Sequence, residues 1–135
     1  MEILPSLSST DNIGKDNDRI KRYTFKGFRV FVGLNALSNE KLISKHLDEH
    51  PRCLWFHAHS ASGAHVILCL GANGISADPS SIDMAAKRYA ASLAIKFSDR
   101  SSKKVNHAPL EDVYKPDNSR VGVFRTWRAD FIEIT

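Results

Sequence analysis

Short runs of apolar residues, separated by glycines and polar residues, recur along the chain, and two stretches instead repeat with helical spacing. Aromatic and β-branched residues predominate in 23–25 and 28–32, which are separated by Lys26 and Gly27. This pattern predicts two strands joined by a tight turn, in which Gly27 supplies a positive φ. Gly33 ends the second of these strands.

A second pair of apolar runs covers 54–59 and 64–69, on either side of the small residues 60–63. Two apolar runs around a short loop with a glycine predict another hairpin. Further short strands are expected toward the C-terminus, where prolines, Asn118 and Gly122 punctuate the chain. Their expected ranges are 105–108, 121–125 and 130–134, with a brief pairing at 113–115.

Two segments carry the helical repeat. The first is expected to open at Ser38 and to end before Pro51, with Leu42, Ile43, His46 and Leu47 on one apolar stripe. The second starts at 80–83, where hydroxyl and acidic residues suit a helix N-terminus, and continues through an alanine-rich stripe to Phe97. Lys96 and Arg100 lie at its C-terminal end, where positive charge is favoured. Turn formers fill 71–79 between the second hairpin and this helix.

The order of these elements predicts an α+β domain. Hairpins rather than regular βα alternation favour an antiparallel or mixed β-sheet, and we expect the two main helices to pack on one face of it. Residues 1–19 are polar and are expected to form a flexible leader, and residues 20–135 to form a single domain.

Composition fits this domain. A chain of 135 residues with 42% apolar residues is long enough for one core. No run approaches the roughly 18 apolar residues of a membrane helix, and no secretory signal is expected at the N-terminus. We therefore expect an intracellular, cytoplasmic protein with no membrane partner. Cys53 and Cys69 are expected to be buried thiols rather than a disulfide.

Charge is unevenly distributed. The whole chain carries a formal charge of +4, whereas the segment from Lys87 to Arg128 has ten Lys or Arg and four acidic residues, a net +6. This excess predicts a locally basic surface of the kind that binds phosphate, with a solvated charged face as the alternative.

Three histidines surround the second predicted turn, at His57, His59 and His65. Trp55, His57 and His59 alternate and share one face of a regular strand. His65 lies on that face only if the register of the two strands pairs residues whose numbers add up to an even total, such as 57 opposite 65. A bulge at Gly63 would decide whether this total is even or odd.

The sequence resembles the NFACT-R domain, an RNA-binding module best known from ribosome-associated quality-control factors. The resemblance spans about residues 22 to 134, and its most specific block is Cys53-Leu54-Trp55-Phe56-His57-Ala58 followed by Ser62-Gly63-Ala64-His65-Val66. Further matches are Gly27-Phe28-Arg29-Val30-Phe31-Val32-Gly33-Leu34-Asn35, Asn39-Glu40, the alanine-rich helix, Val113-Tyr114-Lys115-Pro116 and Gly122. Leu34, Cys53 and Ala64 depart from the arginine, aspartate and serine usual in the family.

The resemblance implies a non-enzymatic RNA-binding domain that contacts tRNA or ribosomal RNA in translation-linked quality control, with ribosome-associated factors as possible partners. Unpaired bases stack on aromatic and imidazole rings, and cations hold phosphates. The expected nucleic-acid-binding residues are Arg29, Asn35, Asn39, Trp55, His57, His59, His65, Lys103, Lys104, Lys115 and Arg125. Asn35 and Asn39 have capping or turn formation as alternative roles, and Trp55 has a place in the core.

Other functions stay open at this point. The domain could bind a partner protein and little nucleic acid, or bind DNA. The histidines with Cys53 could hold zinc, Ser60 or Ser62 could act as a nucleophile beside a histidine, or the histidines could be satisfied groups of a packed interface. We expect no catalytic residue, no cofactor and no metal.

Overall fold

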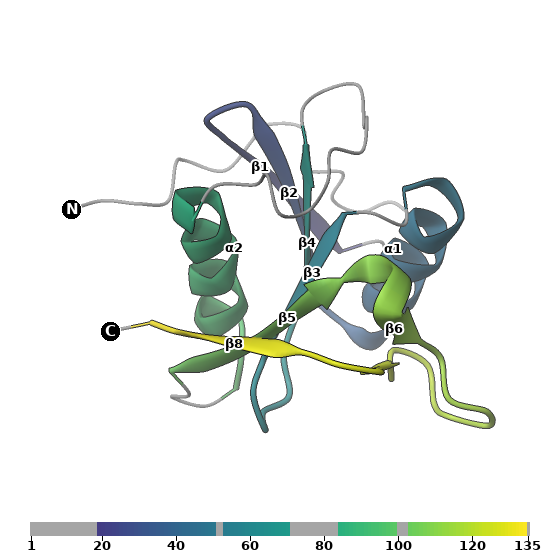
Figure 1. Cartoon of the computed structure of the whole chain (residues 1–135). Coiled ribbons are helices and arrows are strands. Elements are labelled where there is room, and N and C mark those ends of the chain that lie inside the picture. Colours follow the sequence, from purple (N-terminus) through teal and green to yellow (C-terminus); the bar gives the residue numbers. More distant parts are fainter. Residues whose placement is uncertain (1–18, 51–52, 71–83, 100–102, 135) are drawn as a thin grey trace.

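The computed structural model describes residues 19–50, 53–70, 84–99 and 103–134, and these contain one six-stranded antiparallel sheet flanked by two helices (Figure 1). The strand order is β1-β2-β4-β3-β5-β8. The strands are β1 (Ile20–Phe25), β2 (Phe28–Gly33), β3 (Leu54–Ala58), β4 (His65–Leu70), β5 (Lys104–Pro109) and β8 (Asp130–Glu133). The predicted α+β class and the hairpin-built sheet are confirmed, and every pairing in the sheet is antiparallel.

The first hairpin turns at Lys26 and Gly27, as predicted. Both residues have positive φ, 51° and 86° respectively. Two consecutive left-handed residues match the right-handed twist of the flanking strands, which makes this turn type common in two-residue hairpins. A Cβ at Gly27 would meet no atom within 4 Å, so the backbone conformation alone favours glycine there.

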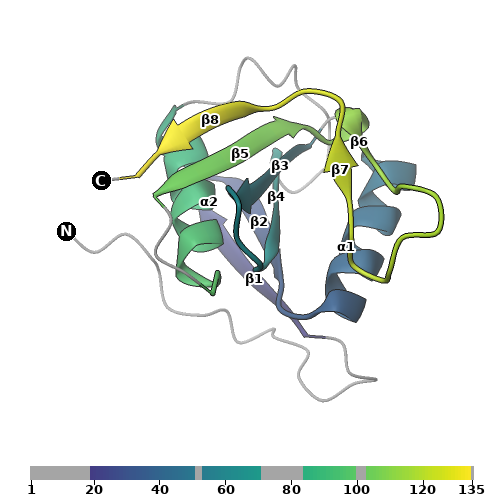
Figure 2. The same cartoon turned by 90° about the horizontal axis from the view of Figure 1, so that it is seen from below.

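The two helices, α1 (Ala36–Glu49) and α2 (Met84–Lys96), lie on opposite faces of the sheet (Figure 2). The prediction that both pack on one face is therefore wrong. Its physical reason lies in the central strands, which are apolar at consecutive positions. Leu54 and Phe56 face α2, whereas Trp55 between them faces α1. A strand that is apolar on both faces needs a cover on both faces.

The first helix starts two residues earlier than predicted. The Asn35 side chain accepts a hydrogen bond from the Ser38 backbone N–H at 2.8 Å and so caps the helix. Ser38 is buried, and its hydroxyl accepts a hydrogen bond from the Arg19 backbone N–H at 2.7 Å. The predicted stripe is confirmed, since Leu42, Ile43 and His46 are all buried.

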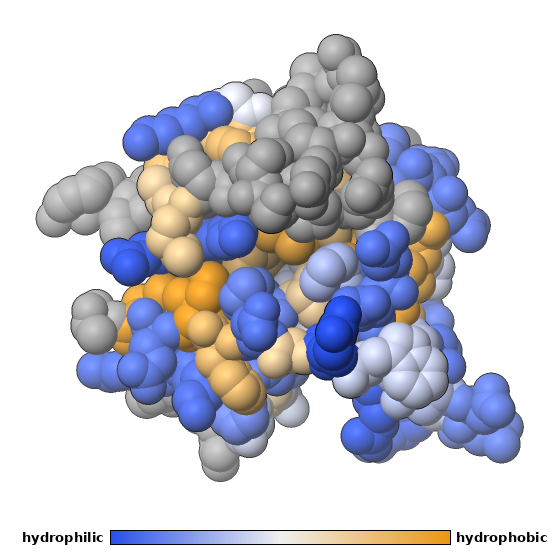
Figure 3. Space-filling model, in the orientation of Figure 1, coloured by the Kyte–Doolittle hydropathy of each residue, from blue (hydrophilic) through white to orange (hydrophobic). Residues whose placement is uncertain are grey.

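The C-terminal segment adds a 3₁₀ turn, η2 (Leu110–Asp112), and a small two-stranded sheet of β6 (Val113–Tyr114) and β7 (Arg125–Thr126). The strand predicted at 121–125 is wrong except for its last residue, because Gly122 lies in a turn with φ 86°. The predicted brief pairing near Val113 is confirmed. The loop between β6 and β7 projects from the body of the molecule, and its surface is hydrophilic (Figures 1 and 3).

Both cysteines are free and buried, as predicted. Within the described residues, no helix has the length and apolar character needed to cross a membrane. The expected leader up to residue 18, the turn-forming segment at 71–79 and the predicted helix start at 80–83 lie outside the described residues.

Candidate functional site

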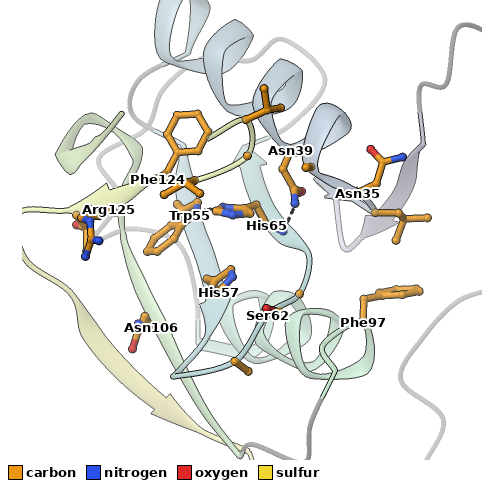
Figure 4. Close-up of a pocket in the computed structure, with 18 of the residues that line it drawn as sticks. Asn35, Asn39, Trp55, His57, Ser62, His65, Phe97, Asn106, Phe124 and Arg125 are labelled. Carbon is orange, nitrogen blue, oxygen red and sulfur yellow. Dashed lines mark hydrogen bonds between the residues drawn. The ribbon is translucent and has the colours of Figure 1, made fainter. Parts of the chain in front are cut away.

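A pocket of about 830 Å³ opens between the start of α1, the β3–β4 hairpin and the chain from 121 to 126 (Figure 4). We call it the central pocket. Six of the residues expected from the sequence line it: Asn35, Asn39, Trp55, His57, His65 and Arg125. The other five, Arg29, His59, Lys103, Lys104 and Lys115, do not.

The strand register brings His57 and His65 together. Leu54 pairs with Leu68 and Phe56 with Val66, so paired numbers sum to an even value. The two imidazole centroids are 4.7 Å apart. The parity condition set by the sequence is therefore met, and both rings lie on the sheet face that also carries α1.

His65 is a structural histidine. It is 5% exposed, and its Nδ1 accepts a hydrogen bond from the Trp55 indole N–H at 2.9 Å. Burial, together with the neighbouring His57, lowers the pKa of His65 to about 3, although a hydrogen bond to the Gly122 backbone opposes this shift. His65 is therefore neutral at physiological pH with Nδ1 unprotonated, so Nε2 carries the proton.

His57 is the histidine that the pocket exposes. Its ring lies almost parallel to the Trp55 indole, with an interplanar angle of 3° and centroids 5.9 Å apart. The side chain is half-buried, and Figure 4 shows it pointing into the pocket. Burial lowers the pKa of His57 below its usual value, so this ring is neutral at pH 7. A neutral, partly exposed imidazole offers a flat surface and hydrogen-bonding edges rather than a positive charge.

Asn39 anchors the hairpin to α1. Its Oδ1 accepts a hydrogen bond from the His65 backbone N–H at 3.1 Å. Gly33 makes this contact possible, because a Cβ at this position would overlap Asn39 Oδ1 and lie 3.1 Å from the Asn39 backbone. Asn39 and the capping Asn35 thus have structural roles through their oxygens.

The outer wall of the pocket is held by a clamp on Gly122. The Gly122 backbone N–H donates to Glu40 Oε1 at 2.7 Å, and Glu40 forms a 3.0 Å ion pair with Lys115. Lys115 also donates to the carbonyl of Val123 at 3.3 Å and lies 5.2 Å from the Phe124 ring centroid. Burial raises the pKa of Glu40, but the hydrogen bonds from Gly122 and Lys115 outweigh it, so the pKa of this carboxyl lies below its usual value.

Lys115 therefore braces the pocket wall in this structure, whereas the sequence assigned it to phosphate. The basic surface expected for 87–128 is also not a single surface. Lys87 and Arg88 belong to α2, which covers the sheet face opposite the central pocket. Among the described residues that line the pocket, only Arg125 carries a permanent charge.

The sheet face continues beyond the pocket to an exposed aromatic ring. Asn106 lines the pocket opposite His57, and its Oδ1 is 3.1 Å from Nδ1 of His59. His59 meets the Phe131 ring edge-on at 5.1 Å, and Lys104 Nζ lies 4.6 Å from the same ring centroid. Phe131 is 51% exposed. His59 and Lys104 thus form a platform with Phe131 next to the pocket.

Phe131 was not among the site residues expected from the sequence, and neither were Tyr114, Phe97 and Phe124, which line the pocket. A signal for Phe131 was present, since Phe131 and Ile132 are adjacent in β8 and adjacent strand residues point to opposite faces. Ile132 enters the core, which leaves Phe131 outside. Tyr114 stacks on Trp127 with centroids 4.2 Å apart, and Trp127 is 70% exposed.

The remaining expected residues lie elsewhere. Lys103 is exposed just before β5, where its carbonyl accepts a hydrogen bond from the Ile134 backbone N–H at 2.7 Å. Arg29 pairs with Cys69 in the sheet and lies over the Phe31 ring, 5.7 Å from its centroid. Within the described ranges, no group of three or more His, Cys, Asp and Glu side chains is arranged to hold a metal ion.

The fold and the pocket define a small antiparallel α+β domain with a largely uncharged pocket of aromatic, imidazole and amide groups beside one helix. The family model described as the NFACT protein RNA binding domain matches residues 20–121. Because this match covers most of the chain, the chain belongs to the NFACT RNA-binding domain family, as its sequence motifs predicted.

A solved structure supports this assignment. The C-terminal part of the fibronectin/fibrinogen-binding protein from Streptococcus suis is similar to this chain, with a TM-score of 0.70 and 25% sequence identity. The similarity covers 84% of this chain and 44% of that chain, so this chain spans less than half the length of its structural neighbour. A comparison with curated proteins gave no match.

Proposed function

We propose that this domain binds RNA without catalysing a reaction, and that the central pocket receives an unpaired base. The observation that carries this proposal is the pairing of a partly exposed neutral ring, His57, with amide side chains inside a pocket large enough for a nucleobase. Membership of an RNA-binding domain family supports the same assignment.

The chemistry of the pocket favours a base over a phosphate. Both histidines that line it have depressed pKa values, so they bring no positive charge at pH 7. Flat imidazole and aromatic surfaces stack on bases, and side-chain amides hydrogen-bond to base edges. Three side chains offer such amide groups to a base. Asn35 and Asn39 offer their N–H groups, because their oxygens already bind backbone, and Asn106 offers its whole amide.

The platform formed by His59, Lys104 and Phe131 suits a second nucleotide. An exposed aromatic ring with a cation beside it combines a stacking surface with a phosphate contact. Because Asn106 links this platform to the pocket, two neighbouring nucleotides of one strand would use both. This arrangement favours a single-stranded or loop region over a regular duplex, whose bases are already stacked.

The biological ligand we propose is tRNA or ribosomal RNA, bound in translation-linked quality control inside the cell. This proposal extends the family's RNA-binding character and the resemblance to quality-control factors. It involves no cofactor.

A titration of fluorescently labelled single-stranded RNA tests the proposal. With 4 to 6 phosphates contacted, log K should fall with log salt at a slope of about −3 to −5. His57→Ala should weaken binding by about 5- to 160-fold, the range for loss of a base-stacking ring. His107→Ala is the matched control, because His107 stacks on Phe56 outside the pocket. An affinity that does not respond to salt, or equal affinities for the two variants, contradicts the proposal.

Protein binding is the second candidate, and Trp127 favours it. A tryptophan that is 70% exposed and stacked on Tyr114 resembles an interface anchor. The S. suis neighbour is described as a fibronectin/fibrinogen-binding protein. Surface plasmon resonance with purified fibronectin, using Trp127→Ala as the variant, tests this candidate separately.

Comparing RNA with a DNA oligonucleotide of the same sequence tests the DNA alternative, because a difference in affinity between them reports contacts to the 2′-OH.

A further inference from the structure

A second pocket lies on the opposite flank of α1 from the central pocket. It has a volume of about 540 Å³ and opens between strands β1 and β2 and the C-terminal half of α1. We call it the α1 groove. Its floor includes Phe31 and Leu42, which belong to the core on the α1 face of the sheet. Its charged residues are Arg22, Arg29, Lys41, Lys45 and Glu49, and its histidines are His46 and His50.

The charge of the α1 groove is strongly positive. Four permanent cations face one carboxylate, Glu49. His46 adds none at pH 7, because burial lowers its pKa and outweighs the opposing hydrogen bond between its Nδ1 and the Leu42 carbonyl, 2.9 Å away. The central pocket, in contrast, has Arg125 alone among its described lining residues. The two cavities thus divide the chemistry that a nucleotide strand requires, with rings and amides in one and positive charge in the other.

We propose that the α1 groove binds phosphate groups of the RNA strand whose base enters the central pocket. This inference rests on the proposed function. Arg side chains present several N–H donors in a fixed planar arrangement that suits phosphate oxygens, and Lys adds compact positive charge. The half-buried Arg22 and Arg29 line the groove from β1 and β2, and Lys41 and Lys45 line it from α1.

The positions of the two cavities are compatible with one continuous ligand. Both open on the α1 face of the sheet, the groove over β1–β2 and the pocket over β3–β5. Three strand spacings separate these pairs in the sheet order, which corresponds to about 14 Å. A few nucleotides of an extended strand span such a distance, so the helix lies beneath the connecting phosphates.

The double variant Lys41→Gln/Lys45→Gln tests the groove. Both lysines are exposed on α1, and glutamine is a good helix former, so the fold should be retained. The salt slope for single-stranded RNA should become shallower by about 1.4 if each lysine neutralises one phosphate, and affinity at low salt should fall. Arg88→Gln removes an exposed cation from α2 on the other sheet face and should leave the slope unchanged.

A charge change in the opposite direction separates binding from folding. Glu49→Gln removes the carboxylate that faces the groove, so RNA affinity should rise, which a folding defect cannot produce. If His57→Ala weakens binding while the lysine double variant and Glu49→Gln leave affinity and slope unchanged, the groove proposal is overturned and the proposed function stands. If the unmodified chain shows no salt-dependent RNA binding, both are overturned.

Discussion

The indole N–H of Trp55 donates to Nδ1 of His65 across 2.9 Å, and this bond separates the roles of two neighbouring histidines. His65 is buried and hydrogen-bonded to Trp55 and to the Gly122 backbone, whereas His57 stacks on the same indole and is only partly buried. The tryptophan thus supports both rings, one through its N–H and one through its face. Trp55 itself is only 3% exposed, so it supports both histidine rings from within the core while it lines the pocket.

Trp55→Phe should destabilise the domain. Phenylalanine keeps a flat ring but leaves the buried Nδ1 of His65 without a donor, which costs about 1–3 kcal/mol. Urea denaturation should show this as a lower free energy of unfolding with an unchanged m-value. Trp127→Phe is the matched control, because exposed substitutions usually change stability by less than about 0.5 kcal/mol. Equal midpoints for the two variants would argue against the Trp55–His65 bond.

Stability should fall as pH falls from about 6.5 toward 3. Burial lowers the pKa of His65 to about 3 and also depresses the pKa values of His46, His57 and His107. An unfolded histidine titrates near pH 6.5, so within this window the unfolded chain binds protons that the folded chain does not. His65 alone should remove about 2 kcal/mol between pH 6.5 and 5.

Urea midpoints at pH 7.5, 6 and 5 measure this dependence. His65→Phe removes the titrating group, so its stability should depend less steeply on pH even if the variant is less stable overall. Parallel pH profiles for the two proteins would mean that His65 binds its proton equally well in the folded and the unfolded chain, which contradicts the lowered pKa.

Gly33→Ala should disrupt the link between the hairpin and α1. The added Cβ would overlap Asn39 Oδ1, so Asn39 must release the His65 backbone N–H. Overpacking of this kind costs about 1–3 kcal/mol. Adding Asn39→Ala removes the overlapping oxygen, so the double variant should lose less stability than the sum of the two single variants. Strict additivity in denaturation experiments would contradict this contact.

Phe131→Ala should weaken RNA binding without unfolding the domain. Phe131 is 51% exposed, so its removal costs little core packing, whereas a stacked base would lose about 1–3 kcal/mol of interaction. Fluorescence anisotropy should show a loss of affinity of at least about fivefold. Met84→Ala, at a residue of α2 that is 52% exposed, is the control. Unchanged affinity would remove the platform from the interface.

Local signals in the sequence predicted most of the elements. The Lys26–Gly27 turn, the apolar stripe of α1 and the β3–β4 hairpin follow from residue type and spacing, which act over a few positions. The side of the sheet that each helix covers depends on contacts between distant segments. Even so, the consecutive apolar residues Leu54-Trp55-Phe56 indicated a strand buried on both faces, and the prediction of helices on one face overlooked it.

The candidate site was only partly predictable for the same reason. Whether His57 and His65 share a face of the sheet depends only on the register between their two strands. The sequence could therefore state their proximity as a condition on that register. Lys115 could not be assigned in this way. Its ion pair with Glu40, and the neighbouring hydrogen bond between Glu40 and Gly122, each join residues at least 75 positions apart in the chain. No local sequence pattern marks such pairs. The distribution of charge along the sequence likewise did not show that the cations of α2 lie on the sheet face opposite the central pocket.

The position of α1 between the two cavities has a consequence for ligand length. An oligonucleotide too short to cross the helix can occupy only one flank, whereas a longer one occupies both through a single covalent chain. Once one flank is occupied, binding to the other flank is intramolecular. It then depends on a high effective concentration of the tethered nucleotides rather than on a second encounter in solution. Affinity should therefore increase abruptly at a threshold number of nucleotides, which is set by the distance that the strand must cover to pass over α1.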